Sequence, residues 1–235
     1  MPRQAHGITR EGSRIATLRC SSGKFLIFCH SVSRFHERVG DDITAQADFS
    51  QMVPLTSVLP INTGLSSATE HTMVSILGSP KLPLTTKDQP SRASDLVKKL
   101  KTQAKISSHI SVEGIGPAVD SLTEVLQKIF KEEPELKDVL GTEGMLNVRF
   151  RKPTSGKKST QISNHAWGTA IDFKIVGKKA PGNTGGKIPR FIAVLLPFFN
   201  KAGWFSGIAF HDTMHFEVAE ETIRTWSKKH LLDAA

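Results

Sequence analysis

Residues 163–173 read SNHAWGTAIDF, and this stretch places His165 seven positions before Asp172. From residue 169 onward, apolar and polar side chains alternate through TAIDFKI, a pattern typical of a β-strand with one buried face. Asp172 then lies on the opposite, accessible face, while Gly168 permits unusual backbone angles or a close backbone approach. We therefore expect the loop to fold back over its own strand and to bring His165 to Asp172. The side chains expected in the core are Ile171, Phe173 and Ile175.

The flanking segments predict an α+β fold, in which helices pack a small antiparallel sheet. Apolar residues recur at helical spacing on both sides of the opening stretch, and Pro197 is expected to kink or break the second of these helices. The expected elements are, in chain order, a helix beginning at Gly116 and limited by Pro134, strands over 145–151 (MLNVRFR) and 169–175, a helix from Pro189 to about Gly203, a strand-like segment over 207–219, and a surface helix over 220–232.

At 235 residues the chain has room for one sizeable domain and appendages. Residues 1–70 lack sustained periodicity and are expected to form an irregular or disordered basic arm. A connector over 71–108 would begin with a short extended piece near Met73 and include a brief basic helix capped by Ser94. Residues 109–235 are then expected to form the domain that carries the function.

Composition restricts the possible partners and cofactors. The formal charge of +9 favours polyanions, yet the basic residues are spread over many segments without interleaved aromatic residues, so we expect anionic wall polymers rather than nucleic acid. With only Cys20 and Cys29, a metal must be held by nitrogen and oxygen atoms. No apolar run is long enough to span a membrane, and charged residues interrupt the candidate core of a signal peptide, which leaves the location of the protein open.

A second cluster, HDTMHFE over residues 211–217, supplies two histidines and two carboxylates. One interpretation places His211 and His215 one turn apart on a metal-binding helix, but the flanking residues are typical of a strand. The other combines His215 with His165 and Asp172 into a three-ligand zinc site whose fourth position stays open for water.

The pattern S-x-H-x-x-G-x-A-x-D from Ser163 to Asp172, followed by D-x-x-H-F-E from Asp212, resembles the zinc peptidases that cut peptidoglycan stem peptides. That family includes D-alanyl-D-alanine carboxypeptidases, dipeptidases of the vancomycin-resistance type and phage endolysins that cut the L-alanyl-D-glutamate bond. The similarity covers about residues 110–225. It implies a hedgehog/D-Ala-D-Ala peptidase-like fold, and stem peptides as the partner. The implied zinc ligands are His165, Asp172 and His215.

The resemblance also implies Asp212 as the general base, where many members carry glutamate and one endolysin branch is similar to this chain. A carboxylate there can take a proton from water whose pKa zinc lowers to about 7. Asp212 would point away from His215 in an ideal strand, so this role requires a bend at Thr213 and Met214. Arg149 is the preferred donor to the developing oxyanion. The predicted substrate-binding residues are Ser163 and Arg151.

Two other classes of function remain open on this reasoning. The hedgehog signalling domain is similar in fold and zinc site but acts as a binding module, so the ligands alone do not establish catalysis. A basic polyanion-binding protein with a structural zinc site is the second alternative. The presence of Asp212 favours an enzyme, without deciding whether an L-alanyl-D-glutamate endopeptidase or a D-alanyl-D-alanine carboxypeptidase is encoded.

Overall fold

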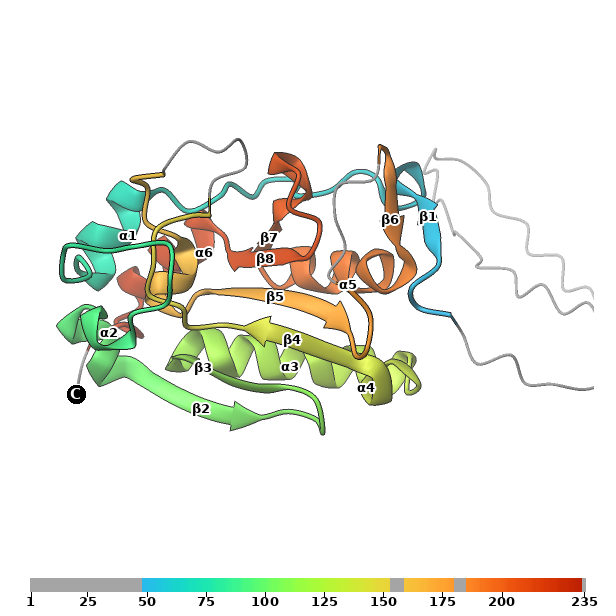
Figure 1. Cartoon of the computed structure of the whole chain (residues 1–235), viewed down its shortest axis with the longest axis horizontal. Coiled ribbons are helices and arrows are strands. Elements are labelled where there is room, and N and C mark those ends of the chain that lie inside the picture. Colours follow the sequence, from blue (N-terminus) through green and yellow to red (C-terminus); the bar gives the residue numbers. More distant parts are fainter. Residues whose placement is uncertain (1–47, 153–158, 180–184, 234–235) are drawn as a thin grey trace, which may run out of the picture. The chain divides into compact units, whose positions relative to one another are not determined.

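A computed structural model describes residues 48–152, 159–179 and 185–233. Residues 44–235 form one compact unit. Its elements are short strands paired in antiparallel fashion and helices packed against them, which confirms the predicted α+β class (Figure 1). Within the described residues, no helix is both long enough and apolar enough to cross a membrane.

The central sheet brings together strands that lie far apart in the sequence. Its register pairs Asp172 with His215 and Gly144 with Asp172, so the two halves of the sequence motif meet on adjacent strands. The predicted alternation of the middle strand is confirmed, because Ile171 and Phe173 are fully buried. The strands, in spatial order, are β4 (Leu140–Gly144), β5 (Ala170–Ile175), β8 (His215–Val218) and β7 (Trp204–Ser206).

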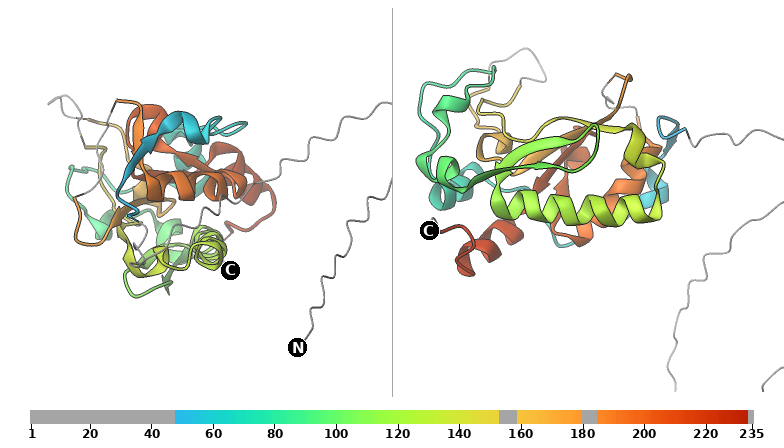
Figure 2. Two further views of the ribbon diagram at one scale, coloured as in Figure 1. Left: turned by 90° about the vertical axis from the view of Figure 1, so that its right-hand side faces the viewer. Right: turned by 90° about the horizontal axis from the view of Figure 1, so that it is seen from below.

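Two long helices bury apolar faces in the core, α3 (Gly116–Glu132) and α5 (Arg190–Lys201). Helix α3 packs against α5 and the hairpin of β2 (Lys101–Lys105) and β3 (Ser111–Ile115), and α5 packs against β7. Both match the predicted helices in position, and Figure 2 shows α3 running alongside the strands. Pro197 lies inside α5, and the helix nonetheless continues past it. The ring of Phe199 on α5 packs 4.6 Å from that of Phe216, so the helix and the sheet share one aromatic core.

Residues 145–151 were expected to form a strand, and this prediction is wrong. The preceding residues Leu140–Gly144 form β4 instead, and Gly144 ends it with a φ of 104°. The Asn147 amide donates to the His165 carbonyl and the Val148 amide donates to Asp88, so these N–H groups serve a loop rather than a ladder. A short helix, α4 (Leu136–Val139), leads into the strand.

The expected arm over residues 1–70 falls into two parts, of which residues 1–47 lie outside the described residues. Residues 59–69 contain no helix or strand, as expected, whereas residues 52–58 differ from the expectation of irregular structure. Strand β1 (Met52–Pro54) pairs with β6 (Lys187–Pro189), Phe49 is buried, and the 3-10 helix η1 (Leu55–Val58) follows. Pairing with a strand so distant along the chain leaves no local periodicity by which to predict it.

The expected connector over 71–108 contains regular elements as well. The extended piece predicted near Met73 is helix α1 (Glu70–Leu77), whose Thr69 side chain caps the first turn. Ser94 caps a short helix as predicted, but the helix ends at Leu100 and the chain continues as a hairpin. The remaining elements are η2 (Pro90–Arg92), α2 (Asp95–Leu100), β2 (Lys101–Lys105), β3 (Ser111–Ile115) and the closing helix α6 (Glu220–Lys228).

Candidate metal centre

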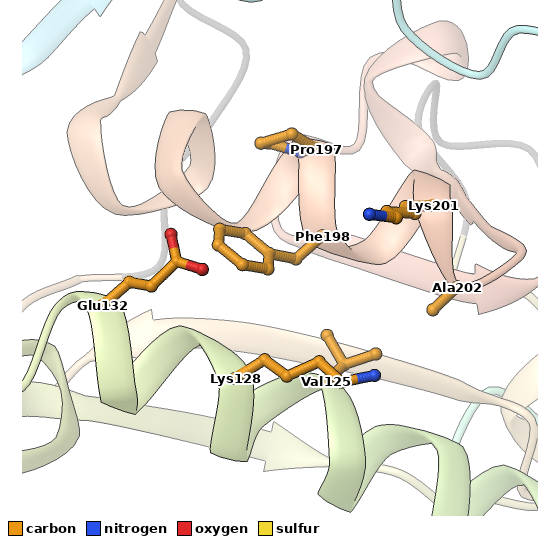
Figure 3. A pocket seen from close by; sticks show the side chains of 7 residues that line it. All are labelled: Val125, Lys128, Glu132, Pro197, Phe198, Lys201 and Ala202. Atoms are coloured by element: carbon orange, nitrogen blue, oxygen red, sulfur yellow. The ribbon is translucent and has the colours of Figure 1, made fainter. Parts of the chain in front are cut away.

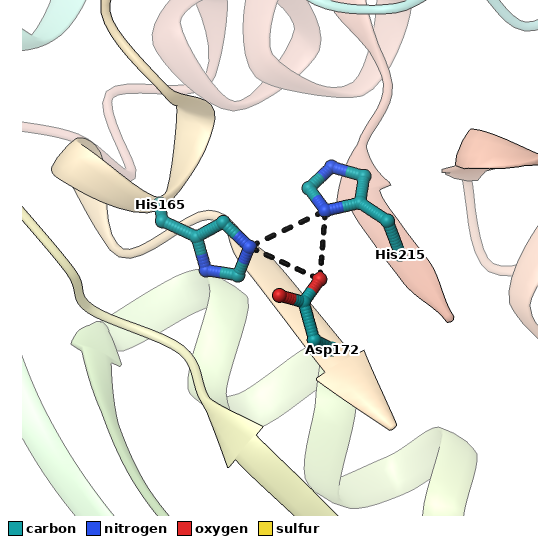
Figure 4. A group of neighbouring side chains, drawn as sticks. All are labelled: His165, Asp172 and His215. Carbon is teal, nitrogen blue, oxygen red and sulfur yellow. Dashed lines mark hydrogen bonds and ion pairs between the residues drawn. The ribbon is translucent and has the colours of Figure 1, made fainter. Parts of the chain in front are cut away.

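His165, Asp172 and His215 converge on one point at the edge of β5 and β8 (Figure 4). Nε2 of His165 lies 3.2 Å from Oδ1 of Asp172, and Nδ1 of His215 lies 2.9 Å from the same oxygen. The two ring nitrogens are 3.3 Å apart. The three side chains predicted to act as ligands therefore meet.

The local backbone explains how His165 reaches the sheet. It sits in the 3-10 helix η3 (Asn164–Trp167), which Gly168 ends in the left-handed conformation with a φ of 65°. A Cβ atom at Gly168 would lie only 2.7 Å from the Cα of Gly114 on β3. Both properties expected of this glycine, unusual angles and close backbone approach, are thus present.

Each histidine presents one ring nitrogen to the centre and uses the other to hold its orientation. Nδ1 of His165 donates to the Met145 carbonyl at 2.9 Å, and Nε2 of His215 donates to Glu217 at 2.8 Å. These outer hydrogen bonds are those that metal-binding histidines make in proteins, and they turn the inner ring nitrogens toward the centre.

The donor set fits zinc in both chemistry and spacing. Two imidazole nitrogens and one carboxylate oxygen form the usual three-ligand arrangement of hydrolytic zinc sites. Ligands about 2.0–2.1 Å from a tetrahedral zinc ion lie about 3.3 Å from one another, and the three donor atoms here are separated by 2.9–3.3 Å. His165 and His215 are both buried, so the site is shielded on its protein side.

In the absence of a metal ion, the negative charge of Asp172 and a protonated His215 stabilise each other. Burial would raise the pKa of Asp172, but the neighbouring His165 and His215 imidazoles outweigh it and hold the pKa well below its usual range. Burial would lower the pKa of His215, yet hydrogen bonds to Asp172 and Glu217 raise it to about 10. A cation that binds here therefore replaces a proton on His215.

Asp212 follows the 3-10 helix η4 (Gly207–Phe210), in the loop that leads into β8. The bend required at Thr213 and Met214 is present as a turn, and the His215 amide donates to the Asp212 carbonyl at 3.3 Å. Partial desolvation raises the pKa of the Asp212 carboxyl, with the charge of Asp172 adding to the shift and that of His215 opposing it. Asp212 therefore lies within electrostatic reach of the proposed ligands.

Arg149 and Arg151 flank an isolated bridge between Phe150 and Ile162 rather than lying in a regular strand. The Arg149 carbonyl accepts from the Ser163 amide, and the Arg151 amide donates to the Gln161 carbonyl. Both side chains are half-buried. The Arg149 side chain donates to the Phe150 carbonyl at 3.2 Å, and its charge partly offsets the raised pKa of Asp212.

Ser163 precedes η3 and is buried, with its carbonyl accepting from the Ala166 amide at 2.8 Å. Its backbone thus supports the turn that carries His165. Its expected role in substrate binding stays a prediction. His211 ends η4 with a φ of 67°, and His215 begins a strand, so the interpretation in which these two histidines share a helix is wrong.

Two residues near the site, Gly207 and Phe210, were not predicted from the sequence. A Cβ atom at Gly207 would lie 2.7 Å from the Asp212 carbonyl oxygen and 2.9 Å from the His215 Cβ, so only glycine lets this loop pass so close. Phe210 is 41% exposed, and its ring centre lies 5.6 Å from that of His215. These contacts join residues five to eight positions apart across the turn between η4 and β8, where neither helical nor strand periodicity applies.

Trp167 and Trp204, the tryptophans nearest the two sequence motifs, are packing residues. Both are fully buried, and their indole N–H groups donate to the Gly78 carbonyl and to Ser121. A separate groove lies between α3 and α5, with a volume of about 420 Å³ (Figure 3). None of its lining residues takes part in the metal centre. They are Val125, Lys128, Glu132, Pro197, Phe198, Lys201 and Ala202.

Comparison with known proteins gives one family match. Residues 157–218 match a family model described as D-alanyl-D-alanine carboxypeptidase. None of the curated proteins compared with the chain matches it. The matched segment includes all three proposed ligands and Asp212, whereas Arg149 and Arg151 precede it. The family resemblance seen in the sequence is therefore confirmed over residues 157–218, as a similarity to the D-alanyl-D-alanine carboxypeptidase family.

Proposed function

We propose that the chain is a zinc-dependent peptidase that hydrolyses peptide bonds in the stem peptides of peptidoglycan. The observation that carries this proposal is the convergence of His165, Asp172 and His215, with both outer ring nitrogens already hydrogen-bonded. The family match supports peptidase activity, and the donor set supports zinc. A hedgehog/D-Ala-D-Ala peptidase-like arrangement of the sheet and helices is part of the same proposal.

The residues around the ligands supply the remaining functions of an amide hydrolase. Zinc held by the three ligands would supply Lewis acidity, lowering the pKa of a water molecule and polarising the scissile carbonyl. Asp212 accepts the proton of the attacking water and returns it to the leaving amine. Arg149 donates to the oxygen on which negative charge develops. Ser163 and Arg151 bind a carbonyl or carboxylate of the substrate.

Within this class, we propose cleavage of the L-alanyl-D-glutamate bond ahead of carboxypeptidase activity. The reason is the aspartate at the position of the base, which resembles one branch of the endolysins. The main rival is a non-catalytic binding module with the same ligands. Against it stands Asp212, because a binding module has no need of a carboxylate with a raised pKa beside the centre.

Mass spectrometry of muropeptides tests the proposal. Purified peptidoglycan is digested with the protein alone, with a chelator, and with chelator followed by excess zinc. We expect cleavage that the chelator abolishes and zinc restores. A released L-alanine-bearing glycan identifies the endopeptidase, and a lost terminal D-alanine identifies the carboxypeptidase. Intact muropeptides after incubation with the zinc-loaded protein would contradict peptidase activity on this substrate.

A further inference from the structure

The segment over residues 62–69 lies behind the metal centre, although the family match begins only at residue 157. Oγ of Ser67 donates to Oε1 of Glu217 at 2.5 Å. The other oxygen of that carboxylate, Oε2, accepts from Nε2 of His215 at 2.8 Å. One continuous chain of hydrogen bonds therefore runs from Ser67 through Glu217 to a proposed metal ligand.

We propose that Ser67 is a positioning residue of the metal centre, holding Glu217 so that His215 presents Nδ1 to the cation. The inference rests on the proposed metal site and requires no knowledge of the bond that is cut. It places a residue from the expected N-terminal arm in the support of the site. The domain that carries the function then begins well before residue 109.

Hydrogen bonds on both sides of Ser67 fix the backbone of residues 66–69, so the contact between Ser67 and Glu217 lies in a well-anchored segment. The Ser66 amide donates to Glu221 at 3.0 Å and the Thr69 amide donates to Glu220 at 2.9 Å, both carboxylates belonging to α6. The Ala68 carbonyl accepts from the Asn164 side chain at 3.0 Å, next to His165 in sequence. The hydroxyl of Ser67 is thus delivered to Glu217 by a fixed backbone.

Because Glu217 is buried, its carboxylate depends on the Ser67 hydroxyl as a hydrogen-bond donor. Glu217 is only 2% exposed, so water cannot readily replace a lost donor to its carboxylate. Without Ser67 the carboxylate loses a donor at Oε1 and is held less firmly, which weakens the orientation of the His215 ring. Loss of the direct hydrogen-bond partner of a metal ligand typically costs 10- to 100-fold in metal affinity, and Ser67 acts one hydrogen bond beyond that partner. Because the Asn164 side chain also bonds to Glu217, we expect a loss near the lower end, roughly tenfold.

The test compares Ser67→Ala with Ser66→Ala. Both substitutions remove a serine hydroxyl that bonds to a glutamate, but the partner of Ser66 is Glu221, which bonds to none of the three proposed ligands among the described residues. Zinc affinity is measured by competition with a chromophoric chelator, and ligand geometry by the visible spectrum of the cobalt-substituted protein. We expect Ser67→Ala to lower zinc affinity roughly tenfold and to alter the cobalt spectrum. Ser66→Ala should change neither, and Ser67→Thr should restore both.

Equal affinity and an identical spectrum for Ser67→Ala and the unsubstituted protein would overturn the inference. Should Ser67→Ala fail to fold, Ser67→Cys keeps the volume with a weaker donor and must show the same direction of change in both measurements. Neither measurement depends on peptidase activity. A protein that binds zinc through this network but leaves peptidoglycan intact would refute the proposed function alone, whereas one that cleaves peptidoglycan with Ser67→Ala unaffected in zinc binding would refute this inference alone.

Discussion

Nε2 of His165 lies 3.3 Å from Nδ1 of His215, although the two residues come from separate segments of the chain. The histidines use opposite ring nitrogens because each has its other nitrogen engaged, one by a backbone carbonyl and one by a buried carboxylate. The two outer hydrogen bonds therefore determine which ring nitrogen of each histidine faces the cation.

Asp212→Asn should keep the zinc content and lower kcat by about 10² to 10⁴. The amide is nearly the same size as the carboxylate but cannot accept a proton from water. Initial rates on purified peptidoglycan, measured beside metal content for the same preparation, check this expectation. A rate equal to that of the unsubstituted protein would remove Asp212 from the role of base.

Arg149→Gln should lower kcat by about 10² to 10³, as loss of an oxyanion donor does. Arg151→Gln serves as the matched control and should act mainly on KM, because the proposed function assigns Arg149 to the developing charge and Arg151 to substrate binding. Steady-state kinetics of both variants separate these effects. A larger fall in kcat for Arg151→Gln would exchange the two assignments.

Zinc affinity should rise with pH through the neutral range. The pKa of His215 in the metal-free site is raised to about 10, so at pH 7 the ring carries a proton that zinc has to displace. If zinc binding releases one proton, zinc affinity increases about tenfold for each pH unit. This increase ends once the pH exceeds the raised pKa of His215. Calorimetry in buffers with different ionisation enthalpies counts the protons. Binding at pH 7 without proton release would contradict this linkage.

Gly168→Ala should destabilise the protein more than Gly177→Ala. Both glycines have a positive φ, of 65° and 74°, so both substitutions incur the left-handed strain of about 1–2 kcal/mol. Only at Gly168 would the added Cβ also meet backbone, at 2.7 Å from Gly114, whereas nothing lies within 4 Å at Gly177. Denaturant unfolding with chelator present measures both. Equal losses would show that the close approach of η3 to β3 is not needed for stability.

The spacing of apolar residues in the sequence correctly predicted a strand and a helix whose structure depends mainly on residues close together in the chain. The alternation over residues 169–175 predicts β5, and the helical spacing after Gly116 predicts α3. Convergence of His165 with Asp172 followed from the strand and from Gly168. The turn before His215 followed from the requirement that Asp212 face the centre.

The remaining elements depend on tertiary pairing. Strand β1 is formed by pairing with β6, which lies far away in the sequence. Strand β4 lies at Leu140–Gly144 because that segment pairs with β5. The apolar and basic residues of 145–151 instead line a loop under His165. Ser67 lacks any local motif, because its role appears only once Glu217 is placed behind His215.

Metal analysis of the purified protein beside His165→Ala tests the central claim most directly. The account predicts about one zinc ion per chain in the unsubstituted protein, and loss of that zinc on replacing His165, because three protein ligands are needed to hold it. A protein without stoichiometric transition metal after exposure to zinc, or a His165→Ala variant that retains its full zinc load, would contradict it.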